Sequence, residues 1–392
     1  MNKWNPNMPP AVLQIVPELD AGGAERSTVD IAKALAERGV RALVATQGGR
    51  LERELIAGGG ELLPMPVASK HPLRMYLNAG RIANIIRTQN VLLVHARSRA
   101  PAWSALLAAR RTGVPFVTTY HGVYNARGAM KRWYNSVMAR GDAVIANSNW
   151  TARHILATYR FAPKRLIAIP RGLDLDVFNP SKVEPDRIQA LRNWWGMGAA
   201  VRVILLPGRL TRWKGQLVLV RALARLKREG RLPPDVRAVI AGDSQGRTAY
   251  LKEIVGTIAQ EGLEDVVVVS DHINDMAAAY LAANIVVSAS TDPEAFGRVA
   301  PEAAAMERPV VATDHGGARE TILPGESGLL VTPGSASALA EALAELLARS
   351  PEELAAMGRK GRAHIEAHYT VERMCETTLE LYRELIEARL PG

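Results

Sequence analysis

The sequence has almost no cysteine: Cys375 is the single one among 392 residues. No intrachain disulfide can form, which fits a reducing cytoplasm, and the glutamate-rich helical sequence around Cys375 disfavours a reactive thiolate. No apolar run approaches the ~20 residues that a transmembrane helix needs. Residues 1–10 lack the apolar segment of a signal peptide. These absences predict a cytoplasmic protein with no membrane-spanning helix.

Acidic residues are scarce in the first half of the chain. Residues 1–180 contain 24 Lys and Arg against 11 Asp and Glu, whereas the remainder contains 25 against 28. Such an excess of positive charge favours an anionic partner. The sequence has no aromatic nucleic-acid-binding strand and no paired zinc ligands, so nucleic acid is not expected. An anionic membrane surface, a phosphorylated acceptor or a mere bias toward arginine on helix faces remain as alternatives.

One basic segment also contains interfacial aromatic residues, which are typical of a helix that contacts lipid headgroups. The alternative is an ordinary amphipathic helix whose tryptophan packs inward. The segment spans residues 125–140 and includes Arg127, Lys131, Arg132, Trp133, Tyr134 and Arg140.

Short apolar runs alternate with helical patterns along most of the chain, which predicts parallel sheets covered by helices on both faces. A chain of this length favours two domains. We expect an α/β protein with two doubly wound domains facing a cleft: residues 1–180, a linker at 181–198, residues 199–370, and a final helix at 371–392 that crosses back to the first domain. The expected strands are 11–16, 42–45, 91–94, 116–120, 144–146, 201–206, 237–241, 266–269, 285–288, 310–313 and 329–331.

The strongest chemical signal follows the expected strand at 285–288. Glu294 lies on the loop that leaves this strand, and Glu302 lies in the first turn of the next helix, eight positions later. Between them, a glycine-containing loop can present backbone N–H groups to a ligand. Two carboxylates that flank such donors suit a sugar nucleotide, with hydroxyls on both sides of a phosphate. The loop residues are Phe296, Gly297, Arg298 and Val299.

Two cations occupy another strand–helix loop. Arg209 and Lys214 follow the expected strand at 201–206, and the Pro207-Gly208 pair predicts a turn before them. Such a pair can clamp a diphosphate and stabilise the charge that develops as it leaves. The alternative is a solvated basic loop.

Two further positions are candidates in the first half. Gly22 and Gly23 follow the first strand and open a helix, as phosphate-binding turns do, although many such turns are only tight turns. Their spacing does not match the Gly-x-Gly-x-x-Gly of dinucleotide enzymes. His121 follows the strand at 116–120 and is expected at the carboxyl end of the sheet.

In their order and spacing, these segments resemble the retaining glycosyltransferases of family 4. Glu294 and Glu302 resemble the family's Glu-x7-Glu signature. The resemblance also covers residues 208–215 (Gly-Arg-Leu-x3-Lys-Gly), 169–178 (Pro-Asn-Gly-Val-Asp-x3-Phe, with Arg171 in place of the usual Asn), 22–25, 120–122 and 147–148.

The resemblance implies the GT-B fold and transfer of a sugar from a nucleoside-diphosphate-sugar to an acceptor hydroxyl. It places Arg209 and Lys214 on the diphosphate, Glu302 on the ribose, Glu294 on the transferred sugar and His121 beside that sugar. It implies no side-chain nucleophile, because the leaving phosphate acts as the base. The sequence also resembles bacterial enzymes that build lipopolysaccharide or capsule, and by this analogy a glycan or glycolipid acceptor is expected.

No cofactor and no metal are expected. Asp174 and Asp176 form the Asp-x-Asp that binds a divalent ion in other glycosyltransferases, but Asp174 falls in the turn motif, and Arg209 and Lys214 can neutralise the diphosphate. Two alternative functions stay open. A nucleotide-sugar 2-epimerase would need additional acid–base carboxylates in the first domain, and a non-catalytic binding protein would not need the cation and glutamate set.

Overall fold

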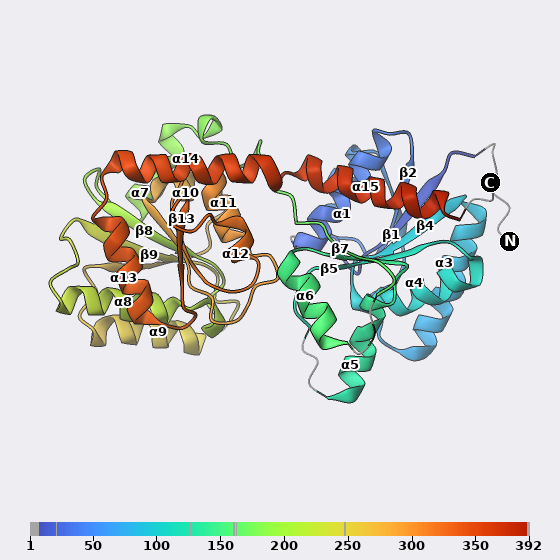
Figure 1. Ribbon diagram of the computed structural model, residues 1–392, viewed down its shortest axis with the longest axis horizontal. Coiled ribbons are helices and arrows are strands. Elements are labelled where there is room, and N and C mark those ends of the chain that lie inside the picture. The colour runs from blue at the N-terminus through green and yellow to red at the C-terminus, as the bar shows by residue number, and fades with distance from the viewer. Residues whose placement is uncertain are drawn as a thin grey trace. The chain divides into compact units, whose positions relative to one another are not determined.

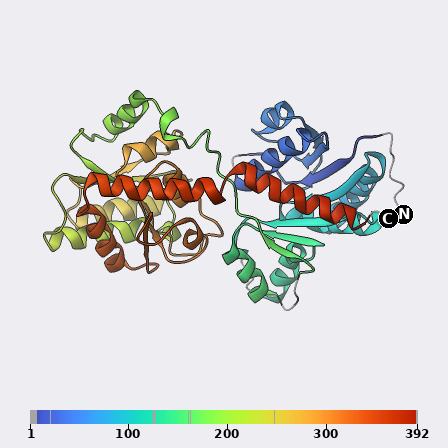
Figure 2. The same ribbon diagram turned by 45° about the horizontal axis from the view of Figure 1, so that its top comes forward.

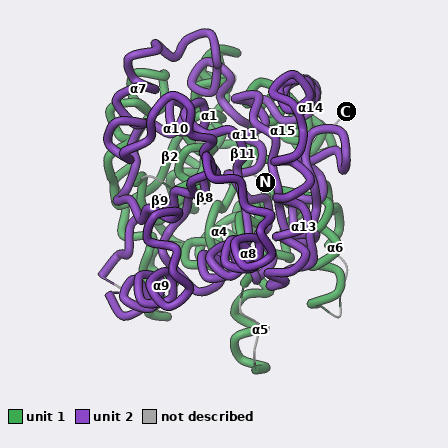
Figure 3. The backbone as a smooth tube through the Cα atoms, turned by 90° about the vertical axis from the view of Figure 1, so that its left-hand side faces the viewer, with its two compact units in different colours: residues 1–172, 371–392 green, residues 173–370 purple. Residues whose placement is uncertain are grey.

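The computed structural model describes residues 8–20, 22–124, 128–159, 161, 163–246 and 248–389. They form two compact units (Figure 3): unit 1 comprises residues 1–172 and 371–392, and unit 2 comprises residues 173–370. Within the described ranges, no helix combines the length and apolar character needed to cross a bilayer.

Unit 1 is built around a parallel sheet in the order β3-β2-β1-β4-β5-β6-β7. Its strands are β1 (Ala11–Ile15), β2 (Arg41–Thr46), β3 (Gly60–Pro64), β4 (Val91–Ala96), β5 (Phe116–Tyr120), β6 (Ala143–Ala146) and β7 (Leu166–Ala168). Its helices are α1 (Gly23–Ala36), α2 (Glu52–Ala57), α3 (Pro72–Thr88), α4 (Arg99–Thr112), α5 (Ala129–Asn135), the 3₁₀ helix η1 (Ser136–Ala139), α6 (Asn149–Thr158) and α15 (Val371–Glu387).

The unit 1 sheet is buried on both faces, which explains its nearly continuous apolar strands. Along β1, Leu13 faces the cluster that contains α3 and α4, whereas Val12 faces the cluster of α1 and α15. This alternation follows from the two-residue period of a strand. Figures 1 and 2 show α15 along the same side of the sheet as α1. The final helix thus belongs to unit 1, as expected from the sequence.

Unit 2 repeats this architecture with a parallel sheet in the order β10-β9-β8-β11-β12-β13. Its strands are β8 (Arg202–Pro207), β9 (Val236–Ala241), β10 (Val267–Ser270), β11 (Ile285–Ser288), β12 (Val310–Thr313) and β13 (Gly328–Val331). Its helices are α7 (Pro185–Trp194), α8 (Gln216–Arg228), α9 (Thr248–Gln260), α10 (Met276–Ala282), α11 (Val299–Ala305), α12 (Ala318–Thr321), α13 (Ala336–Leu347) and α14 (Pro351–His368), with 3₁₀ helices η2 (Pro180–Lys182) and η3 (Arg212–Lys214).

The two faces of the unit 2 sheet also carry separate cores. Ile204 of β8 packs with α8, α9 and α13, and the adjacent Leu205 packs with α10 and α11. The expected α/β class with two doubly wound domains is confirmed, and the strand positions expected from apolar runs are found in both sheets.

The boundary between the units differs from the expected one. Unit 2 begins at Leu173 rather than after residue 180, because the Leu173 N–H donates to the carbonyl of Tyr369 at 2.8 Å. The expected linker at 181–198 contains α7, and Trp195 is buried in the core that covers Leu205. The polar residues that suggested a linker lie on the exposed side of this helix.

Candidate functional site

The sheet order of unit 2 creates a switch point between β8 and β11. From β8 the chain moves outward to β9 and β10, then returns to β11 on the other side of β8. In open parallel sheets, ligands bind at such a point, beyond the carboxyl ends of the strands. The loop after β8 carries Arg209 and Lys214, and the loop after β11 carries Glu294. The structure therefore brings the two strongest sequence signals to one place.

The two cations of the β8 loop lie beside one tryptophan. Relative to the ring centroid of Trp213, Lys214 Nζ lies at 4.6 Å and Arg209 Cζ at 5.9 Å. The backbone then turns through Gly215 at φ 76°, where a side chain would clash with Ala289 of the neighbouring loop. This close approach explains the glycine at the start of α8 and holds the cation loop against the β11 loop.

Lys214 forms an ion pair with Glu294. Lys214 Nζ lies 2.8 Å from Glu294 Oε1, and the two side chains are only 13% and 19% exposed. Ser290 Oγ donates to the same oxygen at 2.5 Å. The backbone carbonyl of Glu294 in turn accepts from the Gly317 N–H at 2.9 Å. The carboxylate is therefore held in one place by a cation and a hydroxyl, at the mouth of the switch point.

Glu302 is more buried than the sequence suggested. Its side chain is 8% exposed. Arg298 Nε donates to Oε1 at 2.6 Å, and the Tyr280 hydroxyl donates to Oε2 at 2.8 Å. Burial and the adjacent Glu302 carboxylate raise the pKa of Tyr280 well above its ordinary value, so its hydroxyl remains a donor. A carboxylate has about four lone-pair sites, so further donors can still bind it.

The loop between the two glutamates combines a buried anchor with an exposed turn. Phe296 is 4% exposed, and its ring centroid lies 6.0 Å from that of Tyr369. Gly297 follows at φ 75°, and Arg298 and Val299 lead into α11. The first N–H groups of a helix have no partner within it, so the backbone donors expected at this loop stay a prediction. The Arg298 side chain pairs with Glu302, a contact that the sequence did not reveal.

Unit 1 has its own switch point, between β1 and β4. The loop after β1 leads to Gly22, which precedes α1, and to Gly23, its first residue. A side chain at position 23 would clash with the guanidinium of Arg171. Arg97 follows β4 and is 3% exposed, with Nε 3.0 Å from the Gln14 side-chain oxygen. Gly22 therefore has extended backbone angles, and Gly23 begins α1 directly beneath the guanidinium of Arg171.

His121 lies directly after β5, in the same unit as Gly23. Its Nδ1 lies 3.2 Å from Nη2 of Arg171. Burial, and then the charges of Arg171 and Arg97, lower the pKa of His121 well below its ordinary value. Its carbonyl accepts from the Asn147 side chain at 3.3 Å. The sequence predicted His121 at the carboxyl end of the sheet, but it did not indicate the contact with Arg171.

Three contacts at the unit 2 site involve residues to which the sequence assigned no role: Trp213, Ser290 and Tyr280. Tyr280 has no local signal, because it reaches Glu302 from a different helix. For Trp213, the only signal in the sequence was that this aromatic residue directly precedes the cation Lys214. Asp174 of the Asp-x-Asp segment accepts from the N–H groups of Asp176 and Val177 at 2.8 and 3.2 Å, so it caps a turn.

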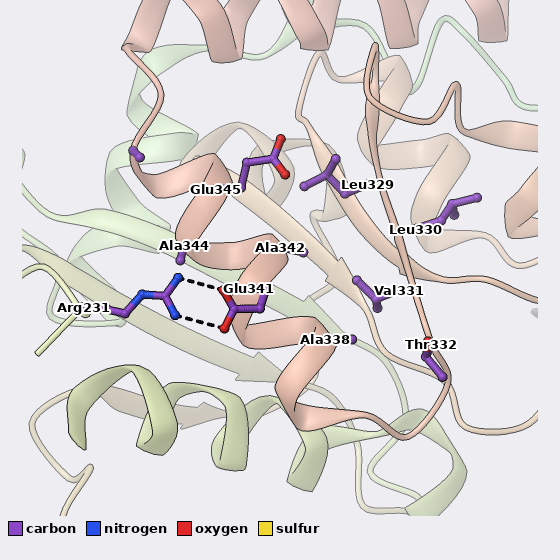
Figure 4. Close-up of a pocket in the computed structure, with 11 residues that line it drawn as sticks. Arg231, Leu329, Leu330, Val331, Thr332, Ala338, Glu341, Ala342, Ala344 and Glu345 are labelled. Carbon is purple, nitrogen blue, oxygen red and sulfur yellow. Dashed lines mark hydrogen bonds and ion pairs between the residues drawn. The ribbon is translucent and has the colours of Figure 1, made fainter. Parts of the chain in front are cut away.

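A separate hollow of about 820 Å³ lies elsewhere on unit 2 (Figure 4). It is lined by α13 and the edge strand β13, and the close-up shows the guanidinium of Arg231 directed at the carboxylate of Glu341. Their Nη2–Oε2 distance is 2.8 Å. None of the candidate site residues lines this hollow.

Both halves of the chain match known families. Residues 21–177 match Glycosyltransferase Family 4, and residues 193–364 match Glycosyl transferases group 1. Among curated proteins, the D-inositol 3-phosphate glycosyltransferase of Kineococcus radiotolerans is 30% identical over 419 residues, covering 94% of this chain and 92% of that one.

Solved structures agree along the whole chain. A glycosyltransferase from Rickettsia africae is 34% identical with a TM-score of 0.86, covering 97% of this chain and 99% of that one. HepE from Anabaena, solved in complex with UDP-glucose, is 26% identical with a TM-score of 0.78, covering 95% of this chain and 99% of that one. With two doubly wound units and matches across both, the chain belongs to the family 4 glycosyltransferases and has the GT-B fold.

Proposed function

We propose that this glycosyltransferase moves a sugar from a nucleoside-diphosphate-sugar, with UDP as the favoured nucleotide, to an acceptor hydroxyl with retention of configuration. The observation that carries the proposal is the Lys214–Glu294 pair at the switch point between β8 and β11. A cation suited to a diphosphate and a carboxylate suited to sugar hydroxyls lie within 2.8 Å of each other. The HepE complexes with UDP and UDP-glucose support the nucleotide.

Charge on the leaving group is the first problem of this reaction. As the bond from the sugar C1 to the phosphate oxygen breaks, negative charge grows on the diphosphate. Lys214 and Arg209 supply cations, and the turn at Gly297 supplies N–H donors, so the site is preorganised for that charge. Lys214 already pairs with a carboxylate of unit 2, and a diphosphate replaces or shares this partner.

The two glutamates hold the neutral ends of the donor. Glu294, fixed by Ser290 and Lys214, accepts from hydroxyls of the transferred sugar. Glu302 accepts from the ribose hydroxyls through lone pairs that Tyr280 and Arg298 leave available, and Arg298 is the partner that moves aside, since its side chain is 47% exposed. Tyr280 is buried and keeps the carboxylate in place.

Retention is proposed to follow a front-face course. The acceptor oxygen bonds to C1 on the face that the diphosphate leaves, and the acceptor proton passes to the departing phosphate oxygen. This course needs no side-chain nucleophile. It also needs no metal, because Lys214 and Arg209 meet the charge and Asp174 is occupied in capping a turn.

The acceptor is proposed to be a glycan or glycolipid of the cell envelope, as in lipopolysaccharide synthesis, reached at an anionic membrane surface. Residues 62–141 contain 12 Lys and Arg and no Asp or Glu. This segment includes α3 and α4, which pack on one face of the unit 1 sheet, and also α5. Most of its described cations are exposed, namely Lys70, Arg74, Arg81, Arg87, Arg110, Arg111, Lys131, Arg132 and Arg140.

Large apolar side chains lie among these cations. Met130 is 86% exposed and Trp133 61% exposed, although Trp133 also stacks on Trp103 of α4 at 4.7 Å. On α3, Tyr76 is 59% exposed and lies under the guanidinium of Arg111. Cations combined with exposed aromatic residues suit a headgroup interface. Arg127, also expected in this patch, lies outside the described residues.

A second acceptor class is favoured by the curated relatives, several of which are named for D-inositol 3-phosphate. A small phosphorylated polyol would also suit the positive charge of unit 1. Both acceptors require the same donor chemistry, so the acceptor is tested separately from the donor.

The experiment begins with a thermal-shift screen of nucleotide-sugars. A donor at 100 times its Kd adds about 2.7 kcal/mol of stability. The stabilising donor is then incubated with either a lipid-linked glycan or inositol 3-phosphate, and NMR determines the anomeric configuration of the product. Retention is expected; an inverted product, or free sugar formed by elimination, would contradict the proposal and support a different mechanism or an epimerase.

A further inference from the structure

Arg171 departs from the family pattern, in which the corresponding residue is usually Asn. It follows β7, and its guanidinium lies over Gly23 at the start of α1. Its Nη2 is 3.2 Å from Nδ1 of His121, which follows β5. Three loops at the carboxyl end of the unit 1 sheet therefore meet at one guanidinium–imidazole contact.

The chemistry of this contact determines where the imidazole carries its proton. A guanidinium has only N–H donors and does not deprotonate in proteins. Nδ1 of His121 must then be the acceptor, so a neutral His121 carries its proton on Nε2. The asparagine of the family pattern would not decide this, because an amide can offer either its oxygen or its nitrogen to the ring.

Nε2 of His121 is buried and has no hydrogen-bond partner within the described residues. His121 and Arg171 line a cavity of about 20 Å³, together with Arg97, Thr119 and Asn147. This space accommodates about one water molecule. The imidazole therefore has one unused donor, and there is room beside the ring for a single oxygen atom.

The charged groups around the ring also oppose its protonation. After burial, the charges of Arg171 and Arg97 lower the pKa of His121, and burial followed by the charge of Arg97 lowers that of His95 on β4. On the packed helices, Asp30 of α1 and Tyr382 and Cys375 of α15 act on Arg97. The cations lie closest to His121, so an imidazolium would face positive charge.

We propose that Arg171 is a positioning residue that holds His121 as the neutral Nε2–H tautomer, so that His121 donates one hydrogen bond to a sugar hydroxyl, directly or through one water. In this arrangement His121 does not act as a general base through Nδ1. The role in catalysis rests on the proposed transferase function, whereas the tautomer does not.

The tautomer is tested by NMR on the full chain labelled with ¹⁵N-histidine. In the wild type, we expect His121 to show an unprotonated Nδ1 and a protonated Nε2. Both nitrogens should keep these protonation states when the pH is lowered below the ordinary histidine pKa of about 6.5. His121→Gln identifies the signal by its loss, and the exposed His71 and His272 provide internal comparisons. A protonated Nδ1, or an imidazolium at neutral pH, would overturn the proposal even if no variant at position 171 folded.

Variants at position 171 then separate positioning from structure. Arg171→Met removes the donors while keeping an unbranched stem, and it should give mixed tautomers and a His121 that titrates nearer its ordinary pKa. Arg171→Lys keeps a donor and should restore the wild-type signals. Unchanged tautomers in Arg171→Met would contradict the assignment of Arg171.

Turnover provides the second measurement. The kcat of Arg171→Met should fall on the acid side of a new transition as His121 takes up a proton, while wild type and Arg171→Lys lack this transition. Identical pH profiles alongside the expected NMR changes would contradict a role of His121 in the reaction, while still supporting the assignment of the tautomer. If no nucleotide-sugar is turned over by the wild type, the proposed function fails, and the NMR result still decides the tautomer.

Discussion

The two units share one architecture, but the cations at their switch points have different kinds of partner. In unit 2, the cations pair with carboxylates: Lys214 with Glu294, and Arg298 with Glu302. In unit 1, Arg171 faces the neutral ring of His121, and the buried Arg97 hydrogen-bonds to the Gln14 side chain. Two cations of the unit 2 site thus contact carboxylates that a charged ligand can displace, whereas the contacts named in unit 1 join a cation to a neutral group.

The same contrast extends to the surfaces. Unit 2 carries a network in which Arg231 pairs with both Glu229 and Glu341. Within the described part of residues 62–141 in unit 1, no cation pairs with a carboxylate, because that segment has no Asp or Glu and the neighbouring acids pair elsewhere. Such exposed cations are available to an anionic partner. The contrast suggests that unit 2 binds the donor and unit 1 binds the acceptor.

The largest expected effect would break the unit 2 half of this comparison. Lys214→Ala or Arg209→Ala should lower kcat about 10²–10³-fold, because each removes a cation that meets charge developing on the diphosphate. Binding of the nucleoside alone should change little. Steady-state kinetics and nucleoside titration measure the two quantities, with Lys252→Ala, an exposed lysine of α9, as the matched control. Near wild-type turnover in Lys214→Ala would contradict the proposal that Lys214 stabilises the charge on the diphosphate.

The next effect concerns the unit 1 surface. Reversing two cations, Lys131→Glu with Arg132→Glu, should weaken binding to anionic liposomes by about 2 kcal/mol or more, since each Lys or Arg near such a surface contributes about 1 kcal/mol. This is roughly thirtyfold. Co-sedimentation at low and high salt measures it, and Lys252→Glu with Arg359→Glu on unit 2 is the charge-matched control. A wild type that ignores anionic liposomes at low salt would point to a soluble acceptor.

Acid should destabilise unit 1 through its buried imidazoles. The pKa values of His95 and His121 are well below the ordinary value in the folded state, mainly because of burial. The unfolded chain takes up these protons first, so stability is full above about pH 6.5 and is lost as pH falls, by about 1.4 kcal/mol per pH unit for each histidine.

Hydrogen exchange of amides in α1 and α15, measured at pH 7.5 and 5.5, tests this expectation. His121→Gln should reduce the acid loss, because one of the two proton-binding sites is gone. His272→Gln changes an exposed histidine of unit 2 and serves as the control. Equal acid sensitivity in all three proteins would show that carboxylates, not these imidazoles, control the pH dependence.

The smallest expected effect is none at all. Turnover should persist in excess EDTA, because Lys214 and Arg209 meet the diphosphate charge without a divalent ion. Kinetic assays before and after extensive chelation measure this. Activity that disappears and returns with Mg²⁺ or Mn²⁺ would give Asp174 and Asp176 a role that the turn geometry argues against.

Much of the fold could be predicted from apolar runs, because central strands buried on both faces have strong local patterns. The strand at 116–120, for example, was expected with its observed bounds. The strands β3 and β7 were not expected, because both are sheet edges that are only partly buried. The start of unit 2 was misplaced because the Leu173–Tyr369 hydrogen bond joins residues that are distant in sequence.

Site residues were predictable where chemistry is concentrated in one loop, and not where it depends on packing. Lys214 and Glu294 stood out in separate motifs, but their ion pair exists only because β8 and β11 are adjacent. The hydrogen bond from the Tyr280 hydroxyl to Glu302 depends on how α10 packs, so no local sequence pattern predicts it. The Arg171–His121 contact likewise joins two loops 50 positions apart.

The division of labour between the units is tested most directly by slow hydrolysis of the stabilising nucleotide-sugar without acceptor, followed as nucleoside diphosphate release. Lys131→Glu with Arg132→Glu changes unit 1, and Lys214→Ala changes unit 2. We predict that the first variant retains wild-type hydrolysis and that the second loses about two orders of magnitude or more. Equal loss in both variants, or loss only in the first, would contradict the assignment of donor chemistry to unit 2.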